Sequence, residues 1–167
     1  LRTWNATSNS WNDQVWSAAS GKRKYQNSQF TNVKGKGPVP EGYYSINLSL
    51  DPDRVATYNP ETMDMYSNFG IQKIPEKGTN TAGKSYSFPG WGTMRARLEP
   101  MKDTETFGRD NFYLHDSVKG YTSGCIETDN AVFGQLMKIR GKQSSIKLKV
   151  LYTAKGGSTG GRAGLLK

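Results

Sequence analysis

The sequence predicts a mainly β domain of the sandwich or barrel type with one short helix, and three observations support this. The chain has 167 residues, enough for one domain with a real core. Only 34% of the residues are hydrophobic and 19 are glycine, a profile of β-rich rather than helical proteins. Several segments alternate apolar and polar residues with the period of a half-buried strand. We expect one domain over residues 1–155 and a flexible, glycine-rich tail over 156–167.

Two strands separated by a rigid turn are expected in the first third of the chain. Trp11–Ser20 indicates the first strand, which runs into a Ser20-Gly21 turn. Residues 35–42 contain three glycines and two prolines, and proline cannot continue a strand ladder, so a turn is expected there. Tyr43–Leu50 shows the clearest alternation of the chain. Its apolar face carries Tyr44, Ile46, Leu48 and Leu50.

The middle of the chain is predicted to contain an irregular excursion followed by two strands. Residues 54–90 have no period and many turn-forming residues, so they are expected to run over the surface. Residues 93–98 alternate, which places Arg95 and Arg97 on one face. Residues 111–115 alternate as well, and this pattern predicts that Phe112 and Leu114 face the core. The opposite face carries Asn111, Tyr113 and His115.

A helix and a last strand complete the predicted domain. Thr128-Asp129 can cap a helix over residues 130–140, and Gly141 can end it. Its apolar stripe comprises Val132, Phe133, Leu136, Met137 and Ile139. The final strand is expected over residues 146–152.

The net charge of +9, from 23 Lys and Arg against 14 Asp and Glu, favours anionic partners such as nucleic acid, membrane surfaces or cell-wall material. The basic residues are scattered and form no nucleic-acid motif, so we expect no nucleic-acid partner and a solvated basic surface instead. No apolar run approaches membrane-spanning length. The first residues show no signal-peptide pattern, which leaves export undecided at this end.

His115 and Cys125 are the only histidine and the only cysteine, and they lie ten residues apart. A thiol is nucleophilic only as the thiolate, and a nearby imidazole is the commonest device for generating it. We therefore interpret the two residues as a catalytic dyad, with a thiolate–imidazolium pair forming if the segment between them folds back like a hairpin. Gly124 allows a tight turn before the thiol, and backbone N–H groups around it could form an oxyanion hole. With one cysteine, neither an internal disulfide nor a structural zinc site is expected, and no cofactor is implied.

The segment from His115 to Thr122-Ser-Gly-Cys-Ile126 resembles the His…Ser-x-Gly-Cys-Ile signature of L,D-transpeptidases, the YkuD-type enzymes. The chain is most similar to their compact branch, which serves as peptidoglycan-targeting effectors of type VI secretion systems. Three further segments, in the same order, resemble that branch and extend the likeness over most of residues 14–135. They are Trp16–Gly21, Gly37–Tyr44, and the stretch from Trp91 through Arg109 to Phe112.

The resemblance implies a β-rich L,D-transpeptidase domain in which Cys125 is the nucleophile and His115 the base. It implies attack on peptidoglycan stem tetrapeptides, with D-alanine expelled and the acyl group passed to water or to an amine. It also implies an antibacterial toxin that acts in the bacterial periplasm, secreted into target cells, with a cognate immunity protein as partner. Thr122, Ser123 and Gly124 would form the loop that carries the oxyanion hole.

The chain departs from the wider family at three positions. Asp116 stands where glycine often follows the histidine, Thr122 where serine is commoner, and Glu127 where an arginine often follows Gly-Cys-Ile. Because guanidinium groups pair well with carboxylates, an arginine elsewhere could take over substrate binding. The candidates for substrate contact are Asp116, Tyr113, Arg95, Arg97 and Arg109.

Other readings remain open at this level. Papain-like and NlpC-type peptidases place cysteine before histidine, and sortases need an arginine soon after the thiol, whereas the first one after Cys125 is Arg140. Cys125 could also be a small buried hydrophobe and His115 a strand residue in a non-catalytic wall-binding or nucleic-acid-binding module.

Overall fold

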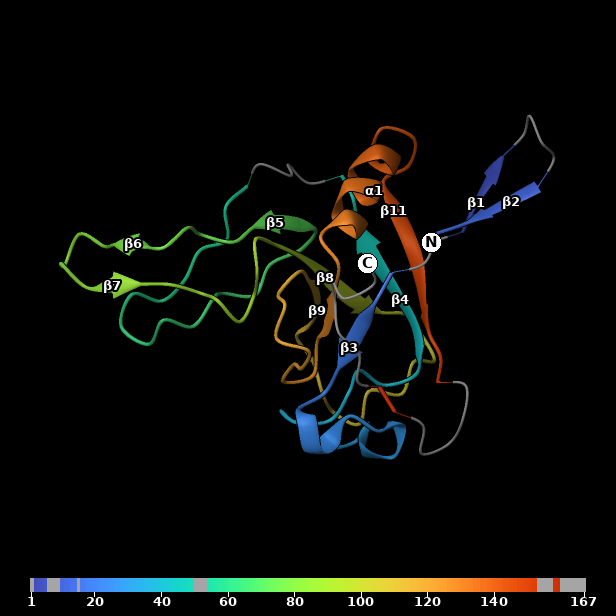
Figure 1. The fold of residues 1–167 in the computed structure, drawn as a ribbon, viewed down its shortest axis with the longest axis horizontal. Coiled ribbons are helices and arrows are strands. Elements are labelled where there is room, and N and C mark those ends of the chain that lie inside the picture. The colour runs from blue at the N-terminus through green and yellow to red at the C-terminus, as the bar shows by residue number, and fades with distance from the viewer. Residues whose placement is uncertain (1, 6–9, 15, 50–53, 153–157, 160–167) are drawn as a thin grey trace.

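The fold is mainly β, as the sequence predicts: a curled, half-barrel sheet covered by one helix (Figure 1). The computed structural model describes all residues except 1, 6–9, 15, 50–53, 153–157 and 160–167. The main sheet has seven strands in the order β11-β4-β8-β9-β10-β3, and β5 pairs with β8 beside this path. Two short hairpins, β1-β2 and β6-β7, lie outside it.

The strands of the main sheet are β3 (Ala18–Ser20), β4 (Gly42–Asn47), β5 (Ile71–Lys73), β8 (Met94–Pro100), β9 (Phe112–His115), β10 (Ile126–Thr128) and β11 (Ser145–Val150). The hairpins comprise β1 (Arg2–Asn5) with β2 (Ser10–Asp13), and β6 (Gly78–Thr79) with β7 (Ser85–Tyr86). The helices are α1 (Ala131–Arg140) and the 3₁₀ turns η1 (Arg23–Tyr25) and η2 (Ser28–Phe30).

Strand β8 holds the sheet together because both of its edges are paired. One edge runs antiparallel to β9, with Arg95 opposite His115 and Arg97 opposite Tyr113. Along its other edge β8 pairs first with β5 and then, at Pro100, with β4. Strand β10 continues the sheet from β9 in the parallel direction, the only parallel pair among the described strands of this sheet.

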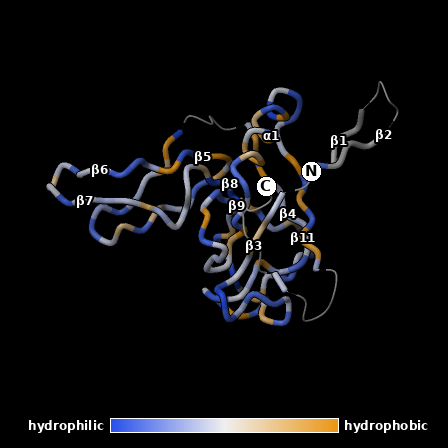
Figure 2. Tube along the Cα trace, in the orientation of Figure 1, coloured by the Kyte–Doolittle hydropathy of each residue, from blue (hydrophilic) through white to orange (hydrophobic). Residues whose placement is uncertain are grey.

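The core lies on one face of the sheet, under α1. The alternation predicted for the strands places its members there: Tyr44, Ile46 and Leu48 from β4 and the residues after it, Phe112 and Leu114 from β9, and Ala96 and Leu98 from β8. From α1, Phe133 and Leu136 are buried against them, while Val132, Met137 and Ile139 pack at the margin. Hydrophobic colour accordingly marks parts of α1, which covers the sheet, and of the edge strand β11 (Figure 2). Among the described residues, no helix is long and apolar enough to cross a membrane.

Several predicted boundaries are wrong or incomplete. The single strand expected over Trp11–Ser20 is two strands, because β2 pairs with β1 whereas β3 pairs with β10. The excursion over residues 54–90 contains β5, which is too short for its period to be visible, and the β6-β7 hairpin, which projects from the sheet (Figure 1). Leu50 lies outside the described residues.

The two described residues of the predicted tail, Ser158 and Thr159, are anchored to the domain. Thr159 is buried, and its hydroxyl donates to the carbonyl of Ser20 at 2.7 Å. The N–H of Ser20 donates in return to the carbonyl of Thr159 at 2.8 Å. At these two residues the chain is therefore fastened to the end of β3, and the rest of the predicted tail lies outside the described residues.

Asp116, directly after β9, joins the start of β8 to the start of α1. Its carboxylate accepts hydrogen bonds from the backbone N–H groups of Thr93 and Met94, at 2.6 and 2.8 Å, and from the side chains of Thr93 and Asn130. Burial works to raise the pKa of Asp116, but the hydrogen bonds outweigh it and hold the pKa below its ordinary value of 3.8. These contacts fix the position at which His115 leaves the sheet.

We predict that Asp116→Asn lowers the free energy of unfolding by about 2 kcal/mol at neutral pH, because a charged acceptor of several hydrogen bonds is lost. Since the folded-state pKa lies below the unfolded one, this stabilisation is complete above the unfolded pKa of about 4 and disappears as pH falls through the folded value. Urea denaturation at several pH values should show the difference from wild type shrinking in acid. Glu76→Gln, at an exposed carboxylate, is the control; a deficit independent of pH would contradict the assignment.

Candidate active site

The outer face of β8 and β9 carries the predicted site residues, because the alternation that buries Phe112 and Leu114 turns Tyr113 and His115 the other way. Arg95 stands opposite His115 and Arg97 opposite Tyr113 in the β8–β9 register. Trp91, just before β8, packs its ring edge-on against both: the ring centroids lie 5.4 Å from Tyr113 and 5.4 Å from His115. Four of the predicted residues are therefore brought together, with a tryptophan that the prediction did not include.

His115 is buried, with 3% of its surface exposed, and is held neutral by its surroundings. Burial and then the positive charge of Lys119 lower its pKa from 6.5 to about 4, although Asp116 works in the opposite direction. Its Nδ1 atom is buried and has no hydrogen-bond partner in the described part of the chain. At neutral pH the imidazole is thus an unprotonated base with a nitrogen still free to bond, which suits a proton acceptor.

Cys125 lies half-buried just before β10, and its sulfur rests beside the start of β9. The Sγ atom is 4.0 Å from the carbonyl oxygen of Asn111, and the backbone N–H of Tyr113 donates to it. Burial raises the pKa of the thiol from 9.0 to about 11, while the Tyr113 N–H and the charges of Arg95, Arg109 and Lys119 act to lower it. The resting thiol is therefore protonated.

The relative placement of His115 and Cys125 follows from the parallel pairing of β9 with β10. Ile126 pairs with Leu114, and Glu127 with His115, so Cys125 comes level with Tyr113, two residues before His115. The segment between them is a crossover that returns along β9 to the start of the parallel strand β10. The expectation of a hairpin-like loop from the sequence is therefore wrong. No hydrogen bond joins the two side chains within the described residues, and the expected thiolate–imidazolium pair is not formed in this state.

Glu127 fastens this crossover from below. It is fully buried, and its carboxylate accepts hydrogen bonds from the Ser117 hydroxyl, from the Lys119 N–H at 3.0 Å and from the Gly120 N–H at 2.6 Å. At the position where the wider family often has an arginine, this chain thus has a carboxylate that organises the loop between the two predicted catalytic residues.

The turn before the thiol is built by Thr122 and Gly124. The Thr122 hydroxyl donates to the Cys125 carbonyl at 2.6 Å and accepts from the N–H groups of Gly21 and Gly124, at 3.0 and 3.3 Å. Gly124 has φ +116°, and a Cβ there would lie 2.6 Å from the Arg109 guanidinium, so only glycine fits. The Gly124 N–H is committed to Thr122, whereas Ser123 is exposed at the pocket.

Arg95 and Arg109 are both buried cations, but their guanidinium groups bind different parts of the chain. The Arg95 guanidinium donates to Gln72 Oε1 and to the Tyr66 carbonyl, and lies over the rings of Trp91 and Tyr113 at 5.2 and 4.7 Å. Arg109 donates to the carbonyls of residues 31, 37 and 38, and so fixes the Gly-Pro turn of residues 35–42 beside the thiol. Neither has a carboxylate partner among the described residues.

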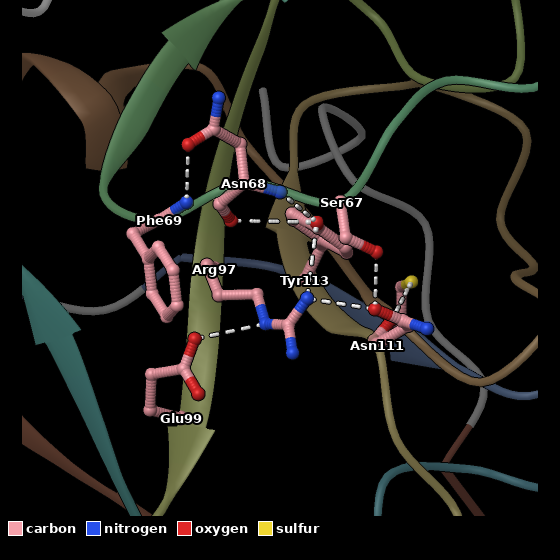
Figure 3. A network of polar contacts seen from close by, with 8 residues as sticks. Ser67, Asn68, Phe69, Arg97, Glu99, Asn111 and Tyr113 are labelled. Carbon is pink, nitrogen blue, oxygen red and sulfur yellow. Dashed lines mark hydrogen bonds and ion pairs between the residues drawn. The ribbon is translucent and has the colours of Figure 1, made fainter. Parts of the chain in front are cut away.

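Asn111 connects the sulfur to a network on the rim (Figure 3). Its backbone is left-handed, with φ +58°, and its side-chain oxygen accepts from Arg97 at 2.7 Å and from Ser67 at 2.6 Å. Arg97 also pairs with Glu99, with 2.9 Å between Nε and Oε1. The Tyr113 hydroxyl accepts from the Asn68 N–H at 3.1 Å. This network ties the loop of residues 65–69 to the strand that carries His115.

A pocket of about 350 Å³ opens beside Cys125. Its lining includes Cys125, Ser123 and Gly124, the cations Lys34, Arg95 and Arg109, the anion Asp110, and Trp91 and Tyr113. Three cations against one anion favour a ligand that carries carboxylate groups. His115 is not part of this lining, and Asp116 has its carboxylate occupied by the hydrogen bonds to Thr93, Met94 and Asn130.

The sequence alone did not single out Trp91, Asn111 or Glu127 as parts of this site. Glu127 carried a signal, as an acidic residue in an otherwise apolar and small segment, but its partners became known only from the crossover. Within the described residues, no group of three histidine, cysteine or acidic side chains could hold a metal ion.

The sequence model of the Tlde1 domain matches residues 14–151, which include every strand of the main sheet, α1 and both predicted catalytic residues. No curated protein matches the chain. Because the match spans well over half of its length, the chain belongs to the Tlde1 domain family, a family of type VI secretion effectors.

Proposed function

We propose that this chain is a cysteine-dependent peptidoglycan enzyme that acts on stem tetrapeptides, as an L,D-carboxypeptidase, an L,D-transpeptidase, or both. The observation that carries the proposal is the single thiol on a cationic pocket, one strand away from an unprotonated imidazole, in a Tlde1 domain. In this proposal Cys125 is the nucleophile and His115 is the base, the roles expected from the sequence.

In the proposed reaction, the Cys125 thiol gives its proton to His115 as the sulfur attacks the carbonyl carbon of the third stem residue. A thioester forms, and terminal D-alanine leaves as its amine takes the proton back from His115. Water or an acceptor amine then attacks the thioester and restores the thiol. Arg95, Arg109 and Lys34 face the pocket and supply the positive charge that the substrate carboxylates need.

The pKa values of the resting protein support a proton transfer that accompanies attack rather than preceding it. With a thiol pKa of about 11 and an imidazole pKa of about 4, the neutral pair is strongly favoured in the free protein. Substrate binding must therefore move Sγ off the Asn111 carbonyl by a change of the Cys125 rotamer. Catalytic hydrogen bonds that tighten only in the substrate complex are common in enzymes.

Cys125→Ala and His115→Ala should each reduce release of D-alanine from purified tetrapeptide muropeptides by about a hundred-fold or more, because the nucleophile or its base is lost. Mass spectrometry of the muropeptides measures the tripeptide product. Both variants should keep the wild-type circular dichroism spectrum, and Glu76→Gln should keep full activity. Undiminished activity of a folded Cys125→Ala protein would exclude the mechanism.

The pH dependence of kcat/KM should show an acid limb near pH 4 instead of the usual histidine value of 6.5. The base works only when unprotonated, so a lowered pKa extends activity into acid. Lys119→Gln removes a charge that lowers this pKa and should shift the limb to higher pH. Lys147→Gln, on β11, changes the net charge equally and should leave the limb in place; equal shifts in both would refute a local role for Lys119.

As a type VI effector, we propose that the protein is delivered into target cells, acts in the periplasm, and is neutralised there by a cognate immunity protein. Wild-type protein directed to the periplasm of a susceptible bacterium should arrest growth, while the Cys125→Ala form should not. Growth curves with muropeptide profiles of the same cultures test this. Normal growth and unchanged tetrapeptide content with wild-type protein would count against the proposal.

A further inference from the structure

A strongly basic surface lies beside the predicted active site, and of its cations only Lys34 and Lys119 have a role in the chemistry above. Residues 14–40 contain five lysines and arginines and no aspartate or glutamate. The five cations are Lys22, Arg23, Lys24, Lys34 and Lys36, and all are exposed. In the part of the chain that the structure describes, none of them forms an ion pair with a carboxylate. We call these five residues, with Lys119, the basic surface.

Tyrosine rings organise part of this surface into a concave shape. Arg23 and Lys119 lie over the ring of Tyr121, at 5.3 and 4.9 Å from its centroid, and Lys36 lies 5.4 Å from that of Tyr25. A hollow of about 520 Å³ is lined by Lys22, Arg23, Lys24, Tyr25 and Tyr121. Three of the six cations therefore border a depression, and ring contacts orient Arg23 there.

The segment that carries most of the basic surface is attached to the candidate active site by hydrogen bonds. Hydrogen bonds between Gly21 and Thr122 fasten the start of this segment to the turn before Cys125. Gln26 donates to the Gly120 carbonyl at 2.6 Å, and Lys34 lines the pocket beside the thiol. The segment forms the end of the domain at which η1 lies, drawn lowest in the view, where much of the trace is hydrophilic (Figures 1 and 2).

We propose that the basic surface binds the carboxylates of neighbouring stem peptides along a peptidoglycan strand while one stem occupies the pocket at Cys125. This inference rests on the proposed function and names the polymer, in preference to an isolated muropeptide, as the substrate. Repeated carboxylates on a chain match repeated cations beside a pocket, and such rim charges govern association more than the chemical step. The attachment of this segment to the turn before the thiol, with Lys34 at the pocket itself, favours a long substrate over a separate acidic protein.

Co-sedimentation with purified sacculi tests the binding, using the full chain with Cys125→Ala so that the wall is not altered. In that background, Arg23→Glu with Lys24→Glu should weaken binding roughly ten-fold, since two favourable charges become repulsive. The matched control is Lys147→Glu with Lys149→Glu: these cations also lie over a tyrosine, Tyr43, at 3.9 and 5.6 Å. Both double substitutions change the net charge from +9 to +5 (9 − 4). A difference in binding between them therefore reports on the basic surface and not on the net charge.

Two further experiments identify the ligand of the basic surface. Sacculi whose carboxylates have been amidated should bind the two double variants equally. In the active background, the Arg23→Glu, Lys24→Glu protein should release D-alanine from soluble muropeptides at the wild-type rate but from sacculi several-fold more slowly.

Equal loss of binding in both double variants, or loss in neither, would overturn the proposal. A difference that persists on amidated sacculi would do so as well, and one seen with DNA but not with sacculi would assign the surface to nucleic acid. If wild-type protein released no D-alanine from either substrate, the proposed function would fail, while the binding comparison would still decide the role of the surface.

Discussion

The parallel pairing of β9 and β10 is the constraint on which the site depends. It sets Cys125 level with Tyr113 and His115 two residues further along, so base and thiol lie on adjacent strands but are staggered. Two residues along a strand span about 6.6 Å, a gap that a change of side-chain rotamer and a bound substrate must close. An antiparallel hairpin of β9 and β10 would place Cys125 differently relative to His115, and it would lack the crossover that carries Lys119.

The crossover is kept in shape from three sides. Glu127 binds its first half, Thr122 ties its second half to Gly21, and Asp116 fixes the point where it leaves β9. Two of these anchors are buried carboxylates without a cationic partner in the described chain, and their hydrogen bonds offset the cost of burying polar groups. Burial, and not these carboxylates, keeps the imidazole and the thiol neutral, near the positive charges of Arg95, Arg109 and Lys119.

Period-two patterns predicted most of the sheet, because each strand that buries one face must alternate. This identified β4, β8, β9 and β11, and it placed Arg95 with Arg97 on one face of β8 and Tyr113 with His115 on one face of β9. The short strands β5 and β10 were missed, and β3 was merged with β2 into one predicted strand, since three residues carry too little pattern. The direction of β10 relative to β9 could not be predicted either, because strand pairing depends on contacts far apart in the sequence.

The proposed mechanism requires a thioester between Cys125 and the substrate. Mass spectrometry of the intact protein, quenched in acid soon after mixing with a tetrapeptide muropeptide, tests it most directly, because the chain has a single cysteine. We expect a covalent adduct of the muropeptide without its D-alanine, located on Cys125 and absent from Cys125→Ala. Release of D-alanine by a protein that never carries such an adduct, even when His115 or the acceptor is varied, would contradict it.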